Sequence, residues 1–357
     1  MKSQIDRRLL IAGFGLAGAA AMTRLAKAGP LVPPPGPIAS TGQSMAELSN
    51  KVARTAQGCA QPRTPISSCP TSPDAQFVIS TSGSYCMTED LYQQAGMCCI
   101  DIQCDDVDID CDGFVFHGSA SGVTSSCIRA SGRRCIEVHE ACFSGWQGCA
   151  CDMASCDSCC VTDCSFRSCF CPSDPATGTL GAVCRLGRGC EFCDCDVLDC
   201  VGSLVHVDDD CDITDCSCVG GSGGGYLCAN GCCCMDCRVS NNAGVAFQCG
   251  QRCVIDDNHV IECGGIACGA ECVICNNDLT SCDAAGGGGG GSGGIIYMYG
   301  GQCCCEENYV SARTGTLVIG IACTAGANEC VINGNQVIGT ISGVTIEQGV
   351  TGCCVVG

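Results

Sequence analysis

CEFCDCDV at residues 190–197 is followed by CDITDCSC at 211–218, CCCMDCRV at 232–239 and CVIDDNHV at 253–260, at intervals of 21 residues. The frame continues as CVICNNDL at 272–279, CCCEENYV at 303–310 and CVINGNQV at 330–337. It occurs earlier as CCVTDCSF at 159–166 and begins again as CCVVG at 353–357. A repeat of this length is typical of a solenoid, because one unit cannot bury its apolar face alone and must stack on its neighbours.

The third and eighth positions of this frame are apolar or cysteine in every complete copy. Between them lie an acidic or turn-forming residue and then Cys or Asn, which predicts a short strand, a tight bend and a second short strand facing one interior. A further strand is expected after each loop, at 204–207, 226–228, 247–249, 266–268 and 321–323. The Leu and Asn signature of a leucine-rich repeat is missing, so the pattern predicts an all-β, right-handed parallel β-helix with about 21 residues per coil.

The sixth position changes from cysteine to asparagine along the chain. It holds Cys164, Cys195, Cys216 and Cys237, and then Asn258, Asn277, Asn308 and Asn335. Equivalent residues of successive coils lie roughly 4.8 Å apart, and an asparagine ladder at a bend satisfies amide groups coil after coil. We interpret the column as one structural position filled by two chemistries.

The fifth position forms an acidic ladder. Its members are Asp163, Asp194, Asp215, Asp236 and Asp257. Like charges at this spacing repel each other. Either counter-ions such as Ca²⁺ bind along the ladder, or the side chains cap their own bends and extend into water; these five residues are the candidate metal ligands.

The N-terminal part has a different composition. Residues 1–28 are expected to be an export signal, with Arg7 and Arg8 before an apolar stretch and a small-residue cleavage site at 26–28. The paired arginines favour the twin-arginine route, and an ordinary secretory signal is the alternative. A Pro-rich linker and a short capping helix, opened by SMAE at 44–47, are expected within 29–58, an N-terminal cap region at 59–97 and the β-helix at 98–357. The apolar stretch is too short for a membrane span.

The chain holds 45 cysteines, all after the expected signal. An exported location, in the periplasm, the cell envelope or outside the cell, would oxidise many of them. Disulfides are expected mainly at the first, sixth and eleventh frame positions, the eleventh being Cys169, Cys200, Cys263 and Cys282. The odd total leaves at least one thiol free, modified or paired between chains.

Thiolate metal binding is the alternative use of these cysteines. Cys149 with Cys151, Cys193 with Cys195, and Cys216 with Cys218 are expected to place both sulfurs on one strand face. CxxC gaps add the pairs 156/159 and 234/237. Two such pairs on adjacent coils could hold zinc or Cu(I). Cysteine is also a small buried hydrophobe that suits a β-helix interior.

The net charge of −20 and the lack of lysine after Lys51 exclude a basic face, so nucleic acid is not an expected partner. Two acidic clusters with histidine are candidate acid–base sites: His206 with Asp208, Asp209 and Asp210, and Asp256 and Asp257 with His259. Neither fits the patterns of polygalacturonases, and no lysine can serve as a lyase base. No catalytic residue or cofactor is therefore assigned.

Several short segments carry a resemblance to a known family. PRTPI at 62–66, GSY at 83–85, VDID at 107–110 with DGF at 112–114, and GW at 145–146 resemble the opening of exported bacterial right-handed β-helix repeat proteins of the pectate-lyase superfold. The resemblance covers roughly residues 30–357 and implies their fold. The chain departs from the family in placing Cys where its members more often have Asn, Gly or aliphatic residues.

These observations favour an exported, non-catalytic structural or binding protein of the cell envelope, stiffened by cysteine ladders, with carbohydrate or envelope components as partners. A carbohydrate-active lyase or hydrolase is the alternative, and thiol-based metal storage is the third. Val344, Ile346 and Val355 near the C-terminal edge are expected to expose apolar surface beside unpaired strand amides, which is a template for self-association. The alternatives are that short strands and the bend at Gln348 and Gly349 blunt this edge, or that the chain frays there.

Overall fold

The computed structural model describes residues 63–356, except 68–71, 95, 119–124, 172–180, 285–293, 315–317, 325 and 341. These residues belong to one compact unit, Gln61–Gly357. The expected signal, linker and capping helix at 1–58 lie outside the described residues. The described part contains strands and no helix, and so no helix that could cross a membrane.

Thirty-six strands form three parallel sheets, which we name A, B and C. Sheet A, with 13 strands, contains β1 (Thr64–Ile66), β3 (Gly83–Met87), β6 (Val107–Asp110), β9 (Ile136–His139), β12 (Cys160–Thr162), β15 (Glu191–Cys193), β18 (Asp212–Thr214), β21 (Cys233–Met235), β24 (Val254–Asp256), β27 (Val273–Cys275), β30 (Cys304–Glu306), β33 (Val331–Asn333) and β36 (Cys354–Val356). Sheet B, with 12 strands, contains β2 (Ala75–Ile79), β5 (Cys98–Ile102), β8 (Ile128–Ala130), β11 (Cys151–Met153), β14 (Ala182–Leu186), β17 (Ser203–Val207), β20 (Tyr226–Cys228), β23 (Val245–Cys249), β26 (Gly264–Cys268), β29 (Gly294–Met298), β32 (Ile319–Cys323) and β35 (Ser342–Ile346). Sheet C, with 11 strands, contains β4 (Leu91–Tyr92), β7 (Val115–His117), β10 (Cys142–Ser144), β13 (Ser165–Arg167), β16 (Asp196–Leu198), β19 (Ser217–Val219), β22 (Arg238–Ser240), β25 (His259–Ile261), β28 (Asp278–Cys282), β31 (Tyr309–Ala312) and β34 (Gln336–Ile338).

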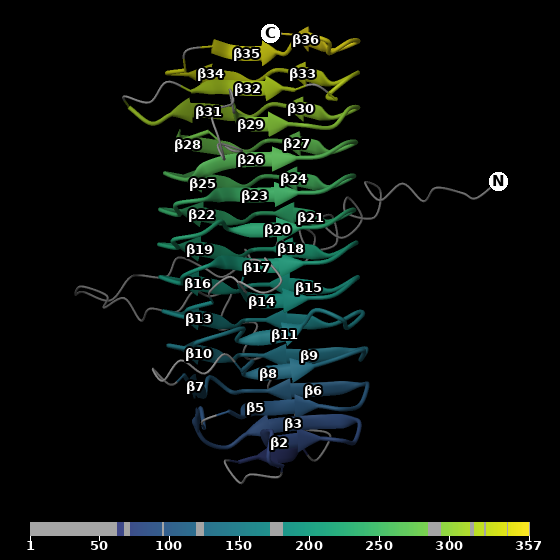
Figure 1. The fold of residues 1–357 in the computed structure, drawn as a ribbon, viewed down its shortest axis with the longest axis vertical. Coiled ribbons are helices and arrows are strands. Elements are labelled where there is room, and N and C mark those ends of the chain that lie inside the picture. The colour runs from purple at the N-terminus through teal and green to yellow at the C-terminus, as the bar shows by residue number, and fades with distance from the viewer. Residues whose placement is uncertain are drawn as a thin grey trace, which may run out of the picture. The chain divides into compact units, whose positions relative to one another are not determined.

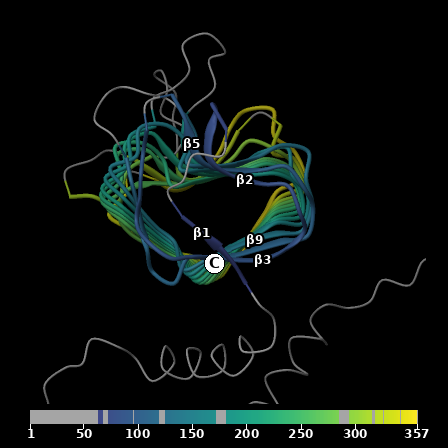
Figure 2. The same ribbon diagram turned by 90° about the horizontal axis from the view of Figure 1, so that it is seen from below.

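The sheets stack coil upon coil along one axis (Figure 1) and enclose a single interior when viewed along it (Figure 2). Each strand pairs with the equivalent strand of the next coil, as Phe192 does with Ile213 and Ile255 with Ile274. The parallel β-solenoid predicted from the 21-residue frame is therefore confirmed, and its third-position side chains form one column. The coil averages about 23 residues, because several coils outside the stretch 190–253, such as those from Cys159 to Cys190 and from Cys272 to Cys303, are longer.

Stacked side chains fill the interior. The rings of Phe116, Phe143 and Phe166 lie 5.0 and 4.8 Å apart, nearly parallel, in successive coils of sheet C. Trp146 is fully buried. Each coil thus buries its inward residues against the equivalent residues of the next coil, which is how a solenoid builds a continuous core.

Three bends per coil separate the sheets, and each has the same backbone conformation. The residue before the first, sixth and eleventh frame positions lies in the left-handed region, as Asp210 (φ 59°), Asp194 (φ 52°) and Asp199 (φ 52°) do. Asp, Asn and Gly tolerate this region best. We call the first, sixth and eleventh positions the corner positions, because each follows such a bend and points inward.

The last strands are the least covered. Val355 and Val356 of β36 are 50% and 51% exposed, and Ile346 of β35 is 40% exposed. Self-association through this edge stays a prediction.

Candidate functional site

The corner cysteines make a regular set of hydrogen bonds. In the sixth-position column, the backbone N–H of Cys164 donates to Sγ of Cys195, 3.4 Å away. The Cys195 thiol in turn lies 3.5 Å from the carbonyl of Val161, in the preceding coil. The same thiol lies 3.1 Å from the carbonyl of Cys193 in its own coil, so it accepts a backbone N–H of the coil before it and places its single proton near two carbonyls.

The asparagine half of the column makes the same bonds. The N–H of Cys237 donates to Oδ1 of Asn258 at 3.0 Å, and Nδ2 of Asn258 donates to the carbonyl of Cys234 at 3.0 Å. Counted from the corner, Cys234 is the counterpart of Val161. The interpretation that one position is filled by two chemistries is thus confirmed: cysteine and asparagine satisfy the same backbone groups.

The first-position column consists of nine cysteines, Cys159, Cys190, Cys211, Cys232, Cys253, Cys272, Cys303, Cys330 and Cys353. The N–H of Cys190 donates to Sγ of Cys211 at 3.4 Å, and Cys211 donates to the carbonyl of Gly187 at 3.0 Å. Thiol–thiol hydrogen bonds with Cys159 and Cys211 lower the pKa of Cys190, whereas the pKa of Cys211 is raised, first by its bond to Cys190. Only some members of such a chain can be thiolates at once, because each thiolate needs protonated neighbours.

Within the described ranges every cysteine is a free thiol. The disulfides expected at the corner positions are not present in the structure, and they stay a prediction for the oxidised protein. The hydrogen bonds above give the corner cysteines a role that does not need oxidation.

Two of the spacing-based thiol pairs turn out differently in space. The prediction that Cys193 and Cys195 share a strand face is wrong, because the left-handed bend at Asp194 separates them: Cys193 accepts from Thr214 Oγ1 outside the core, and Cys195 is buried at a corner. Cys156 and Cys159, by contrast, are both buried, and their interaction lowers the pKa of Cys156.

The five aspartates of the acidic ladder are all exposed, and each occupies a left-handed bend with φ between 52° and 54°. The pKa of Asp236 is raised by partial burial and by the charges of Asp215 and Asp257. The bend conformation accounts for an aspartate at this position. Calcium binding by Asp163, Asp194, Asp215, Asp236 and Asp257 stays a prediction.

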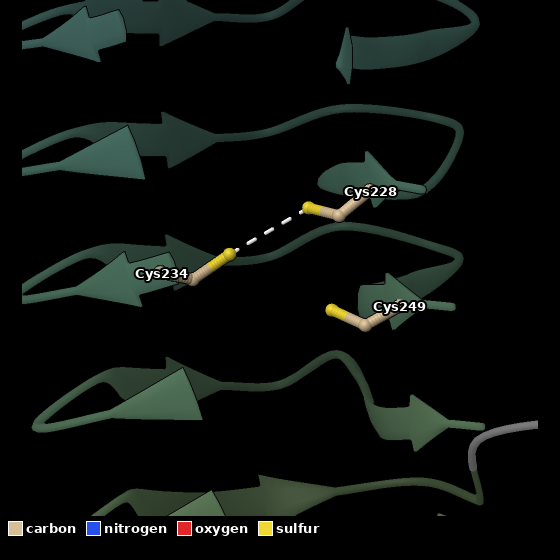
Figure 3. Close-up of side chains that lie close together, drawn as sticks. All are labelled: Cys228, Cys234 and Cys249. Carbon is tan, nitrogen blue, oxygen red and sulfur yellow. Dashed lines mark hydrogen bonds between the residues drawn. The ribbon is translucent and has the colours of Figure 1, made fainter. Parts of the chain in front are cut away.

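A cluster of three thiols lies inside the solenoid rather than at a corner (Figure 3). Cys234 comes from β21 of sheet A, and Cys228 and Cys249 come from β20 and β23 of sheet B, which faces it. Their sulfur atoms all lie within 4.8 Å of one another, and the Sγ atoms of Cys228 and Cys234 are 3.6 Å apart. The CxxC spacing had linked Cys234 to Cys237 instead, because a linear gap does not show which residues face each other across the interior.

The thiols of this core cluster differ in acidity. Hydrogen bonds from Cys228 and Cys249 lower the pKa of Cys234 to about 6, although burial opposes this. The pKa of Cys228 is raised well above its usual value, first by hydrogen bonds to Cys232 and Cys234. Cys234 is therefore the member that ionises first.

A second cluster lies on the outer face of sheet A. Nε2 of His139 is 3.4 Å from Oδ1 of Asp108 and 3.2 Å from Oε2 of Glu137, and its Nδ1 is 2.6 Å from Oγ1 of Thr162. The hydrogen bond to Asp108 raises the pKa of His139, and the same bond lowers the pKa of Asp108. This cluster is not among the sites predicted from the sequence. The signal available was the alternation of VDID at 107–110 and IEVH at 136–139, which places these side chains outward.

The two predicted acid–base clusters are not assembled as expected. His259 forms an ion pair with Asp278, 3.5 Å away in the next coil, while Asp256 accepts hydrogen bonds from Cys275 and Asn276. His206 lies on β17, and burial together with the charge of Arg185 lowers its pKa. Neither histidine is held between two carboxylates as His139 is.

Comparisons with known proteins bear on the fold alone. No protein-family profile and no curated protein matches this sequence. Solved structures with a similar fold include the Dettilon tailspike protein gp208 (13% identity, TM-score 0.37), DFA-IIIase from Arthrobacter chlorophenolicus A6 in complex with DFA-III (13%, 0.41) and the A-module of mannuronan C-5 epimerase AlgE6 from Azotobacter vinelandii (9%, 0.37). These alignments cover 77%, 79% and 79% of this chain, and 58%, 68% and 78% of the respective proteins. The chain thus spans somewhat more than half the length of the tailspike.

Proposed function

We propose that this protein is an exported, non-catalytic β-solenoid of the cell envelope whose cysteines hold its coils together. One observation carries the proposal. At the sixth position of the frame, cysteine contacts the same backbone groups that asparagine contacts further along the column. Residues serving a metal store or a redox centre would have no reason to follow the hydrogen-bonding pattern of an amide. The export signal expected at 1–28 supports the location.

Exchange of the two chemistries tests the structural role. Cys195→Asn/Cys216→Asn places two amides inside the cysteine half of the column, and the variant is expected to melt within a few degrees of the wild type, because its amides reach the same backbone groups. Cys195→Ala/Cys216→Ala is the matched control, and it should melt clearly lower because the corner N–H and carbonyl groups lose their partners. A double asparagine variant that melts as low as the alanine control would contradict the proposal.

The outer cluster of Asp108, Glu137 and His139 favours a second candidate, a carbohydrate-acting site on sheet A. A histidine between two carboxylates provides groups that can donate and accept protons side by side. The test is a turnover screen of the wild type on neutral and anionic polysaccharides. Turnover that disappears in His139→Gln and Asp108→Asn, while both variants stay folded, would establish this candidate and exclude the non-catalytic role.

A further inference from the structure

The core cluster of Cys228, Cys234 and Cys249 differs from the corner cysteines in its surroundings. Its members lie within strands, in columns where neighbouring coils carry Ile213 and Ile255 beside Cys234 and Val207 below Cys228. An apolar side chain would fill each position. Three cysteines from two successive coils instead meet in the interior, from two facing sheets.

The geometry suits a metal ion bound by three sulfurs. A metal–sulfur bond of about 2.3 Å places the sulfurs of a trigonal site about 4 Å apart. The three sulfurs here lie within 4.8 Å of one another, and the closest pair is 3.6 Å apart. Small rotations of the side chains would therefore complete the triangle.

The surroundings select the ion. The three cysteines are 3%, 0% and 1% exposed, so no water is at hand to complete a four-coordinate zinc site. Two more thiols, Cys232 beside Cys228 and Cys253 beside Cys249, also lie at corners, where they contact the carbonyls of Asp208 (3.1 Å) and Ala229 (3.2 Å). Three soft ligands in a dry interior match a soft monovalent ion better than a divalent one.

We propose that Cys228, Cys234 and Cys249 form a trigonal thiolate site for one Cu(I) ion in the core of the solenoid. The ion binds without a change of oxidation state, and each thiol that ligates as a thiolate releases its proton to solvent. Because the site is closed to solvent, the ion enters while the coils are forming.

The full-length chain is refolded without oxygen, under reducing conditions, with a slight excess of Cu(I), and a Cu(I)-specific chelator then removes loosely held metal. The wild type is expected to retain one Cu(I) per chain more than Cys234→Ala. Cys305→Ala is the matched control, since Cys305 is buried in the same third-position column. It is expected to retain as much copper as the wild type. X-ray absorption of the retained copper should show three sulfur neighbours and no nitrogen or oxygen.

Three results would overturn the proposal. Equal copper retention by Cys234→Ala and Cys305→Ala would assign the metal to other thiols. Retention of zinc in place of copper after refolding with both ions would show that the site selects a divalent ion. A disulfide between Cys228 and Cys234 in protein isolated from its own compartment, found by mass spectrometry, would show that the close sulfur pair serves oxidation instead. None of these results bears on the exchange of asparagine for corner cysteine, so the two proposals can fail separately.

Discussion

The cysteine half and the asparagine half of the sixth-position column contact equivalent backbone groups, one through sulfur and the other through an amide. Asn277 accepts the N–H of Asn258 at 3.1 Å and donates to the carbonyls of Ile255 and Cys275 at 2.9 and 2.8 Å. Cys195 accepts the N–H of Cys164 at 3.4 Å and lies 3.5 and 3.1 Å from the carbonyls of Val161 and Cys193. The backbone bend therefore decides which N–H and carbonyl groups meet the side chain. The side chain decides how strong the hydrogen bonds are and which chemistry they have.

The largest difference should come from truncating the asparagine half. Asn277→Ala leaves the N–H of Asn258 and the carbonyl of Ile255 buried without partners, and we expect it to lower the free energy of unfolding by about 3 kcal/mol. Urea denaturation measures the change. A loss below about 1 kcal/mol would show that the amide ladder is not needed for stability.

The next largest difference is expected at alkaline pH. There the contribution of the cysteine half to the unfolding free energy should change with pH, because thiols titrate and amides do not. Burial raises the pKa of Cys195. The pKa of Cys237 is also raised, first by the hydrogen bond between Cys237 and Cys216. In the unfolded chain both thiols lose their protons near about pH 8.5. Their contribution is therefore complete below that pH and declines as pH rises, by about 1.4 kcal/mol per pH unit for each thiol.

Replacing both residues, as Cys195→Asn/Cys237→Asn, is expected to make the fall in unfolding free energy between pH 8.5 and 10 less steep. Denaturation at several pH values checks this. Parallel curves for the variant and the wild type would mean that these corner thiols do not titrate differently in the folded protein.

Truncation of one corner cysteine should have a smaller effect than truncation of Asn277. Thiols are weak donors and acceptors, so Cys195→Ala is expected to cost about 1 kcal/mol. The same urea experiment measures it. Equal losses of unfolding free energy for Cys195→Ala and Asn277→Ala would contradict the prediction that the amide hydrogen bonds are stronger than the thiol hydrogen bonds.

The smallest effect on stability is expected from the outer cluster. Its histidine lies away from the corner positions and so serves as a reference for the corner variants. The pKa of His139 is raised, so its ion pairs stabilise the fold below about pH 6.5, the unfolded value, and this contribution is lost as pH rises through the folded pKa. His139→Gln should therefore lower stability by up to about 1 kcal/mol at pH 5.5 and hardly at all at alkaline pH. A loss that is independent of pH would assign His139 a packing role instead.

Much of the fold could be predicted because a fixed period places equivalent residues in columns. The third-position column from Phe192 to Ile255 followed directly from the 21-residue interval. The core cluster could not be found in this way, because Cys228 and Cys249 belong to sheet B, and only the cross-section of the coil decides what they face. The outer cluster could not be predicted from the frame, because β6 and β9 lie before the regular copies, where the coil length changes. The separation of Cys193 from Cys195 follows from the bend at Asp194, which the frame predicted and which the CxC spacing, taken alone, left out.

The N–H of Cys237 meets the amide oxygen of Asn258 at 3.0 Å, and the next bond along, from Asn258 to Asn277, is 3.1 Å. The boundary between the two chemistries is therefore as well bonded as the asparagine half itself. Because every corner of the column offers the same backbone N–H, the boundary can shift by one coil with a single substitution. Over evolutionary time such a column can exchange thiols for amides one coil at a time, and each exchange replaces a weaker hydrogen-bonding group with a stronger one.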